Sequence, residues 1–365
     1  MGFNAPTKLQ KIALPILLPD PPQNMIAQSQ SGTGKTAAFV LAMLSRVDPS
    51  LNYPQVLCLT PSYELAIQIG NVAAKMSKEC NDIRIRFAVR GEKVERTARL
   101  TEQVIVGTPG KVVDWAMKYK FFDINKIRVF VLDEADTMIG SVMSRFYAQG
   151  QHYQTFCIIR ELPKECQKMF FSTTYNDSVM DFAEALIYNP VLIRLRREEE
   201  VLDNINQYYV ICSNPGEQYV AISNIYRVVT IGQTIIFCCK RRTASRLAEK
   251  MTKNRHTVAL LTGELPVSQR LMTLNRFREG KDRVLITTDV LARGIDFEGA
   301  NLVVNYELPL EHNIDRNQKY QADCETYLHR IGRTGRLGKV GTAVNLIHSP
   351  QAFKTLRQIK EHFGE

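Results

Sequence analysis

The sequence lacks the features of several protein classes. It has no apolar stretch near the roughly 18–20 residues that a membrane-spanning helix needs, so nothing in it predicts a membrane contact. Its N-terminal residues do not have the pattern of a signal peptide. Its 8 cysteines include no Cys-x-x-Cys pair and no zinc-type spacing, and several lie in apolar runs. We therefore expect free thiols in a reduced compartment.

The composition predicts a folded, basic protein. A length of 365 residues is too great for one ordinary core and predicts two domains. The contents of 45% hydrophobic and 23% charged residues argue against extended disorder. The formal net charge of +10 is shared evenly by the two halves rather than carried by a basic tail. Such a surface suits a polyanion that lies across both domains, although many basic proteins bind none.

A phosphate-binding loop is the strongest motif near the N-terminus. It follows the apolar run Met25–Ala27 and leads into Ala37–Leu44, which we expect to be helical. The loop consists of Ser29, Gln30, Ser31, Gly32, Thr33, Gly34, Lys35 and Thr36. Its glycines let backbone N–H groups face phosphates, and the start of the helix adds partial positive charge. Lys35 can reach the β- and γ-phosphates, and the hydroxyl of Thr36 can bind Mg²⁺. The first position of this motif is usually glycine and is serine here.

A carboxylate cluster begins at Asp133, 98 residues after Lys35 of the loop. The mostly apolar run Lys126–Leu132 is typical of a buried parallel strand, and Asp133-Glu134-Ala135-Asp136 comes directly after it. Ligands of open α/β sheets bind at the carboxyl ends of the strands. Asp133 can hold Mg²⁺ through water, and Glu134 can orient or deprotonate an attacking water. The alternative is an acidic helix start without a catalytic role.

Strand-like runs alternate with helical patterns along the whole chain, which predicts an α/β fold with parallel sheets. The charged block Arg194–Asp203 has no apolar period and separates two such regions. We therefore expect a first domain over residues 1–193, a linker over 194–203 and a second domain over 204–365. The chain begins and ends beside motif residues, so we expect it to be a core whose terminal extensions are missing from it.

The second half contains the basic loop His329–Arg336, which has three arginines and two glycines in eight residues. Its glycines allow the backbone to pass close to a ligand, and Arg333 and Arg336 present fork-shaped donors to phosphate. These arginines are candidate fingers on the γ-phosphate when the two domains close. The alternative is a surface loop that the arginines only hold in place.

With these motifs in family order, the chain resembles the DEAD-box RNA helicases of helicase superfamily 2 from end to end. The resemblance implies two tandem RecA-like domains, each a parallel sheet flanked by helices, and ATP hydrolysis stimulated by RNA. Phe3 and Gln10 match the motif that stacks on adenine and reads its edge. Ser172 and Thr174 match the motif that links hydrolysis to strand separation. Asp296 matches the residue that contacts the ribose.

The resemblance also implies a track for single-stranded RNA without base readout, because the matching positions offer hydroxyls, backbone amides and cations. These positions are Pro61, Ser62, Arg90, Gly91, Thr108, Gly110, Lys111, Lys240, Arg278 and Thr287. Thr173 and Lys240 differ from the usual family residues, as does the segment Ser141–Gln154.

The chain is most similar to the nuclear-pore-associated mRNA-export branch of this family, with its testis-expressed relative. That branch implies a nucleoporin and an inositol-hexakisphosphate-linked activator as partners, with a cytoplasmic and nuclear location that includes the nuclear pore. We expect a monomer that uses ATP and Mg²⁺. Two other functions stay open: an ATP-gated RNA clamp with little hydrolysis, and a DNA helicase. Stimulation of the ATPase by RNA, compared with DNA, discriminates among them.

Overall fold

The computed structural model describes residues 5–78, 82–140, 150–195, 204–228, 232–289, 293–297, 299–311, 321–335 and 339–364. Phe3, Arg336 and residues 196–203 of the predicted linker lie outside these ranges. The chain divides into two compact units. Unit 1 comprises Met1–Ser29 and Thr33–Leu195, and unit 2 comprises Gln30–Gly32 and Arg196–Glu365. None of the described helices is both long enough and apolar enough to cross a membrane.

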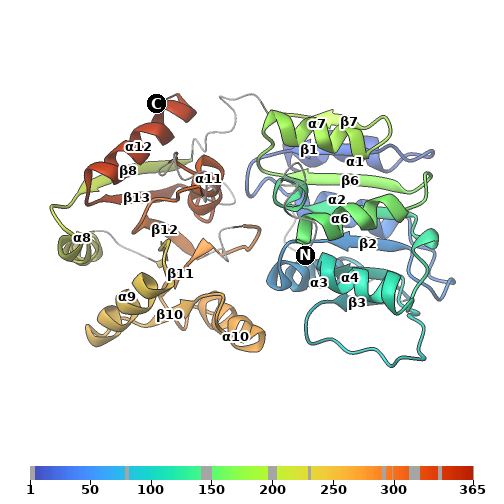
Figure 1. Cartoon of the computed structure of the whole chain (residues 1–365), viewed down its shortest axis with the longest axis horizontal. Coiled ribbons are helices and arrows are strands. Elements are labelled where there is room, and N and C mark those ends of the chain that lie inside the picture. Colours follow the sequence, from blue (N-terminus) through green and yellow to red (C-terminus); the bar gives the residue numbers. More distant parts are fainter. Residues whose placement is uncertain are drawn as a thin grey trace. The chain divides into compact units, whose positions relative to one another are not determined.

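Unit 1 is a parallel sheet with helices on both faces (Figure 1). Within its described residues the strand order is β3-β4-β2-β5-β6-β1-β7. The strands are β1 (Met25–Gln28), β2 (Val56–Leu59), β3 (Ile85–Ala88), β4 (Val104–Gly107), β5 (Val129–Asp133), β6 (Gln167–Ser172) and β7 (Val191–Ile193). The helices are α1 (Lys8–Leu17), α2 (Lys35–Ser45), α3 (Tyr63–Met76), α4 (Pro109–Val113), the π-helix η1 (Asp114–Lys118), the 3-10 helix η2 (Ile124–Lys126), α5 (Ala135–Ile139), α6 (Gln151–Glu161) and α7 (Asp177–Leu186).

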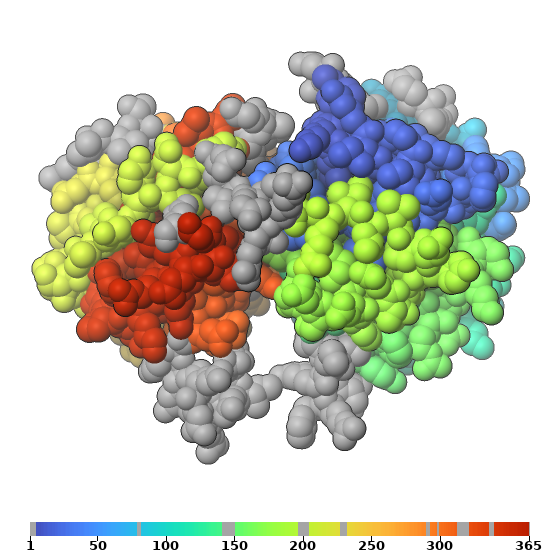
Figure 2. Space-filling view, turned by 90° about the horizontal axis from the view of Figure 1, so that it is seen from above, coloured from blue at the N-terminus to red at the C-terminus, as the bar shows by residue number. Residues whose placement is uncertain are grey.

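The core of unit 1 lies on both faces of this sheet because successive side chains of a strand point to opposite faces. On β5, Val129 and Val131 pack in one cluster with α1, α2 and α3. Phe130 and Leu132 pack in the other cluster with α4, η1, α5, α6 and α7. Every residue of β5 is therefore buried, as the apolar run predicted. Figure 2 shows the N-terminal segment of unit 1 in blue beside the segment of α7 and β7 in yellow-green, and β1 pairs with β7.

Unit 2 has the same kind of fold, a parallel sheet with helices on both faces (Figure 1). Its described strands follow the order β10-β11-β9-β12-β13-β8. The strands are β8 (Ile205–Ile211), β9 (Gln233–Phe237), β10 (Val258–Leu261), β11 (Val284–Thr287), β12 (Ala300–Asn305) and β13 (Gly341–Ile347). The helices are α8 (Pro215–Val228), α9 (Arg241–Lys253), α10 (Val267–Arg278), α11 (Cys324–Ile331) and α12 (Pro350–Phe363). Helices α8 and α9 cover one face, and α10, α11 and α12 cover the other.

The predicted fold class, two parallel α/β sheets flanked by helices, is confirmed. Three strands, β3, β7 and β8, had no signal that we interpreted as a strand. All three lie at the edge of a sheet, where one side of the strand has no neighbour. Polar residues such as Arg86 in β3 and Asn206 in β8 interrupt the apolar run that a central strand has. Strand β7 is apolar but has only 3 residues.

Candidate nucleotide and RNA site

The candidate residues of unit 1 gather at one edge of its sheet. Strands β1, β2, β4, β5 and β6 are all parallel, and each runs directly into a predicted motif. The phosphate-binding loop follows β1, the Pro61–Ser62 pair follows β2, and Thr108 follows β4. Asp133 ends β5 and Ser172 ends β6, and in the ladder Asp133 is paired with Phe171. The chain thus brings these motifs to the carboxyl edge, where open α/β sheets bind ligands.

The phosphate-binding loop has a backbone that requires glycine. Gly34 precedes α2 with φ of 87°, in the left-handed region, and Gly32 has φ of 78°. A Cβ atom at Gly34 would also lie 2.5 Å from Nε2 of Gln10. Lys35 is the first residue of α2, and its buried Nζ donates to the backbone oxygen of Ser29 at 2.6 Å. The ammonium group is therefore held inside the loop, at the N-terminus of the helix, where anions bind.

Gln10, the predicted adenine-reading residue, is tied to the same loop. Its Nε2 donates to the backbone oxygen of Gly34 at 3.2 Å, and its Oε1 accepts from the backbone N–H of Thr7 at 3.0 Å. The Thr7 hydroxyl in turn donates to the backbone oxygen of Thr33 at 2.7 Å. Sequence reasoning did not single out Thr7. The Thr-x-x-Gln spacing of a helix capping box could have identified it, because Thr7 caps α1 in this way.

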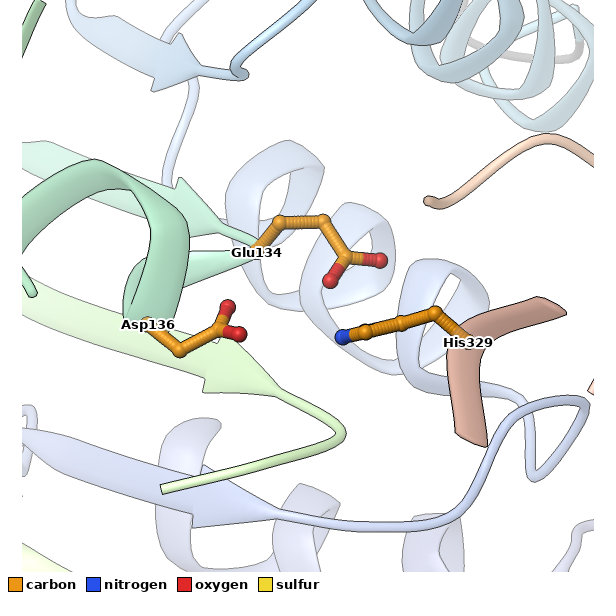
Figure 3. A group of neighbouring side chains, drawn as sticks. All are labelled: Glu134, Asp136 and His329. Atoms are coloured by element: carbon orange, nitrogen blue, oxygen red, sulfur yellow. The ribbon is translucent and has the colours of Figure 1, made fainter. Parts of the chain in front are cut away.

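The three carboxylates of the Asp-Glu-Ala-Asp segment are buried. Glu134 has φ of 53° and ψ of 50°, a left-handed conformation that costs energy for a residue other than glycine. Its Oε2 is buried without a hydrogen-bond partner in the described part of the chain. Figure 3 shows Glu134 at the end of β5 and Asp136 on α5, with both carboxylates directed to the same side. The third labelled residue, His329, belongs to α11 of unit 2.

Asp133, the predicted Mg²⁺ ligand, is a buried carboxylate at the end of β5. Its pKa is raised to about 7, mainly by burial and then by the neighbouring Glu134, whereas Lys35 acts in the opposite direction. Buried carboxylates of this kind are stable as anions only beside positive charge. A divalent cation held by Asp133 and the hydroxyl of Thr36 would supply that charge, so these residues fit Mg²⁺.

Asp136 connects the carboxylate segment to the Ser-Thr-Thr segment after β6. Its Oδ1 accepts from Oγ of Ser172 at 2.7 Å, and its Oδ2 accepts from Oγ1 of Thr174 at 2.8 Å. The structure therefore brings both predicted hydroxyls to the carboxylate cluster. Sequence reasoning gave Asp136 no role of its own. The available signal was the acid after β5 together with the hydroxyls of Ser172 and Thr174 at the end of β6, the strand beside it.

The predicted RNA positions of unit 1 lie around the same edge. Ser62 caps α3 by accepting from the backbone N–H of Leu65 at 3.2 Å, which leaves its O–H able to donate. Arg90 is exposed, and Gly91 has φ of 98°. The ammonium group of Lys111 lies 5.5 Å from the centre of the Trp115 ring. The remaining predicted positions of this group, Pro61, Thr108 and Gly110, are partly buried.

The predicted RNA-binding positions of unit 2 differ from one another in their exposure. Lys240 is exposed and precedes α9, and its backbone N–H donates to Glu307 at 3.2 Å. Nε of Arg278 lies 3.5 Å from the backbone oxygen of Asp296. Thr287 ends β11 and is fully buried, with its hydroxyl donating to the backbone oxygen of the next residue at 2.9 Å. The Thr287 side chain is therefore part of the core, and only its backbone is a candidate for contact with RNA.

The arginines of the basic loop have different surroundings. Arg330, to which sequence reasoning gave no role, forms a two-pronged ion pair with Asp289, with N···O distances of 2.6 and 3.0 Å. It also donates to the backbone oxygen of Glu307 at 2.7 Å. Arg333 donates to the backbone oxygens of His329 at 2.9 Å and Ile295 at 2.6 Å. Arg330 is thus a structural residue of unit 2, and Arg333 also contributes to holding its own loop.

The fold and the site define a protein of two parallel α/β units with a predicted phosphate-binding loop and a buried carboxylate cluster. Residues 7–182 match the DEAD/DEAH box helicase family, and residues 217–338 match the Helicase conserved C-terminal domain.

Relatives match over the whole chain. It is 57% identical over 365 residues to the DEAD-box helicase Dbp80 of Drosophila melanogaster, covering 100% of this chain and 76% of that protein. It is 53% identical to the ATP-dependent RNA helicase DDX19A of Homo sapiens, covering 100% of this chain and 74% of that protein. The solved structure of S. cerevisiae Dbp5 bound to RNA and ADP BeF3 has a TM-score of 0.90 at 43% identity, covering 99% of this chain and 88% of that one. The chain belongs to the DEAD-box ATP-dependent RNA helicases.

Proposed function

We propose that the chain hydrolyses ATP at the carboxyl edge of unit 1 when RNA is bound, and that it uses this cycle to clamp and remodel RNA or ribonucleoprotein. The observation that carries the proposal is the position of Glu134. Its carboxylate is buried on a left-handed backbone directly after β5, and its Oε2 has no partner in the described chain. An acceptor in this state is suited to orient an attacking water and to take its proton.

The other predicted residues bind the nucleotide and the metal ion. Lys35 contacts the β- and γ-phosphates, with the backbone N–H groups from Ser29 to Thr36 around them. Thr36 and Asp133 would hold Mg²⁺. When bound, this ion neutralises charge on the phosphate oxygens. Gln10 contacts the adenine edge, with Phe3, outside the described residues, stacked on the base.

The arginines of unit 2 complete the reaction in this proposal. Arg333 and Arg336 act as fingers on the γ-phosphate, and Asp296 contacts the ribose. Arg336 lies outside the described residues. Fingers supplied by a second element make hydrolysis depend on the arrangement of the two units, which RNA binding would favour. Ser172 and Thr174 couple the cycle to the RNA through Asp136.

RNA contacts in this proposal are made to the sugar–phosphate backbone. Arg90, Lys111, Lys240 and Arg278 supply cations, and the Ser62 hydroxyl supplies a donor. The net charge of +10 supports a polyanionic partner. Contacts of this kind make binding sensitive to salt and nearly independent of sequence.

We also propose that the chain functions in mRNA export at the nuclear pore, as a monomer. A solved S. cerevisiae Dbp5 variant is bound to Nup159, a Gle1 variant, IP6 and ADP. The Dbp5 chain of that structure is 41% identical to this chain, with a TM-score of 0.68. The match covers 100% of this chain and 90% of the Dbp5 chain. The similarity supports a nucleoporin and an inositol-hexakisphosphate-linked activator as partners here.

The test is an ATPase titration with single-stranded RNA and with DNA of the same sequence. We expect the rate of ATP hydrolysis to rise with RNA and to rise far less with DNA, because 2′-hydroxyl contacts select RNA. Tight nucleotide-dependent RNA binding without a rise in hydrolysis would instead support an ATP-gated clamp. Equal stimulation by DNA would support a DNA helicase.

A further inference from the structure

Two buried amides form a polar pair in the sheet of unit 2. Asn305 on β12 and Asn345 on β13 are register partners in adjacent strands, and they are 0% and 2% exposed. Nδ2 of Asn305 donates to Oδ1 of Asn345 at 2.8 Å. Buried amides cost free energy unless their hydrogen bonds are made. The pair therefore needs further partners on the side of the sheet that it faces.

Helix α11 supplies these partners. Nη1 of Arg330 donates to Oδ1 of Asn305 at 3.3 Å. Nδ2 of Asn345 donates to the hydroxyl of Tyr327 at 3.0 Å, and this hydroxyl donates to Oε1 of Gln207 on β8 at 2.7 Å. Tyr327 and Arg330 are three residues apart and so lie on one face of the helix. Side-chain hydrogen bonds thus attach α11 to the neighbouring strands β12, β13 and β8.

The chain that leaves this helix carries Arg333, a finger candidate. Helix α11 ends at Ile331, and Arg333 lies two residues beyond it. Nε of Arg333 donates to the backbone oxygen of His329, in the last turn of α11, at 2.9 Å. The position of the guanidinium group is therefore set in part by α11 itself. A rotation or a slide of α11 on the sheet would displace Arg333 with it.

Apolar packing alone constrains weakly how α11 lies on the sheet. Leu328 and Ile331 pack in one cluster with Ala343 and Ile347 of β13, but the hydrophobic effect has no preferred direction. A hydrogen bond does depend on direction, because it weakens steeply when its angle falls below about 120°. The two hydrogen bonds of the Tyr327 hydroxyl therefore specify the rotation of the helix and its position along the strands.

We propose that Tyr327 and Asn345 are positioning residues of the ATPase. Together they fix α11 on the sheet of unit 2 and so hold Arg333 where it can act on the γ-phosphate. Neither residue contacts the nucleotide in this role. The role rests on the proposed function of Arg333 as an arginine finger. A finger depends on its geometry, since a misplacement of about 1 Å can cost ~10²-fold in rate.

A purely structural role for the hydroxyl predicts a different result. Tyr327→Phe deprives Asn345 and Gln207 of a hydrogen-bond partner, so it should lower the thermal midpoint in either case. If the hydroxyl only stabilises unit 2, the rate per folded molecule stays the same. If the hydroxyl acts through Arg333, the rate falls only while the Arg333 side chain is present. A double-mutant cycle with Arg333→Ala separates the two roles.

The experiment measures kcat and KM for ATP at saturating RNA, together with the thermal midpoint, for the full chain, Tyr327→Phe, Arg333→Ala and the double variant. Single-turnover rates extend the comparison to the slow variants. We expect Tyr327→Phe to lower kcat roughly tenfold and to keep KM within about twofold, because the phosphate contacts expected of Lys35 belong to unit 1. Added to Arg333→Ala, the same change should alter the rate by less than about twofold. Asn345→Ala, which removes the same hydrogen bond from the other side, should show the same dependence on Arg333.

The matched control is Tyr306→Phe. Tyr306 is another buried tyrosine of unit 2, and its hydroxyl donates to the backbone oxygen of Pro215 at 3.4 Å. Its ring packs on the opposite face of the sheet, in the cluster with α8 and α9. This variant also loses one hydrogen bond of a phenol, but it leaves α11 untouched. We expect it to keep the kcat of the unmodified chain.

Two outcomes would overturn the inference. An unchanged kcat in folded Tyr327→Phe would mean that the hydroxyl does not position the finger. An equal fall in rate with and without the Arg333 side chain would mean that Tyr327 acts on the reaction by another route. Failure of the proposed finger is distinguishable from both, because Arg333→Ala alone would then keep full activity.

Discussion

The hydroxyl of Thr174 donates to Oδ2 of Asp136 at 2.8 Å, while Ser172 donates to the other oxygen of the same carboxylate at 2.7 Å. All three side chains are buried. The last acid of the Asp-Glu-Ala-Asp segment thus accepts hydrogen bonds from two hydroxyls of the Ser-Thr-Thr segment. The two segments follow the adjacent strands β5 and β6. This contact joins the segment that carries Glu134 to the segment expected to respond to RNA.

Removal of either hydroxyl should destabilise unit 1. We expect Ser172→Ala and Thr174→Val each to cost roughly 1.5–3 kcal/mol in the free energy of unfolding, because each removes a hydrogen bond to a buried charged group. Urea unfolding of the full chain measures this cost. The control is Ser178→Ala, which removes an exposed hydroxyl that donates to Asn176 in the same unit. A cost no greater than that of the control would contradict the structural importance of the contact.

Asp133→Asn should stabilise the protein without nucleotide and metal, and more so at high pH. The carboxyl has an ordinary pKa of 3.8 that the fold raises to about 7. Between these values the folded state binds more protons than the unfolded state, so the carboxyl lowers stability as pH rises through this window. Above pH 7 the loss of stability caused by the buried, charged carboxylate is complete, and the neutral side chain of asparagine removes it. Thermal midpoints from pH 4 to pH 8 in EDTA measure the effect.

The control for this pH series is Asp48→Asn, because the hydrogen bond from the Ser50 side chain lowers the pKa of Asp48. A lowered pKa contributes stability above the unfolded pKa that is lost as pH falls through the folded pKa. Asp48→Asn should therefore be slightly destabilising at neutral pH, with the opposite sign to Asp133→Asn. A destabilised Asp133→Asn at pH 8 would show that the buried charge is compensated within the apo protein.

Two of the three arginines of the basic loop, Arg330 and Arg333, should separate into a structural and a catalytic residue. Arg330→Lys loses the two-pronged pair with Asp289 and should cost roughly 1.5–3 kcal/mol in the free energy of unfolding. Arg333→Lys should lower kcat more than about 10²-fold, since a point charge replaces the guanidinium fork poorly and fingers contribute ~10³–10⁵ in rate. Thermal midpoints and kcat, measured on both variants, distinguish the roles. Full activity in a folded Arg333→Lys would argue that Arg333 only holds its loop.

Gln10→Ala should weaken the preference for ATP over GTP. The change removes the amide that contacts both Gly34 and Thr7, together with the predicted pairing to the adenine edge. The ratio of kcat/KM for ATP to that for GTP measures the preference, and the dependence on Mg²⁺ should not change. Equal hydrolysis of both nucleotides by the unmodified chain would rule out adenine recognition by Gln10.

The central strands and the loop motifs could be predicted from the sequence because each leaves a local signal. The apolar run before Asp133 identified β5, and the Gly-Lys-Thr sequence identified the start of α2. Contacts that depend on the pairing of strands left no such signal. The hydrogen bond from Ser172 to Asp136 spans 36 residues, and nothing in the local sequence indicates the left-handed backbone of Glu134. The edge strands β3, β7 and β8 also escaped, whereas the edge strand β10 was identified by its apolar run Val258–Leu261.

The measurement that tests the account most directly compares the unmodified chain with Glu134→Gln. The change keeps the size of the side chain and removes its ability to accept the proton of water. We predict that kcat with saturating RNA falls to background, while the affinities for ATP and for RNA in the presence of ATP stay within about threefold of the unmodified values. Glu134→Gln with undiminished RNA-stimulated kcat would mean that the water is activated elsewhere, and the assignment of the site would be wrong.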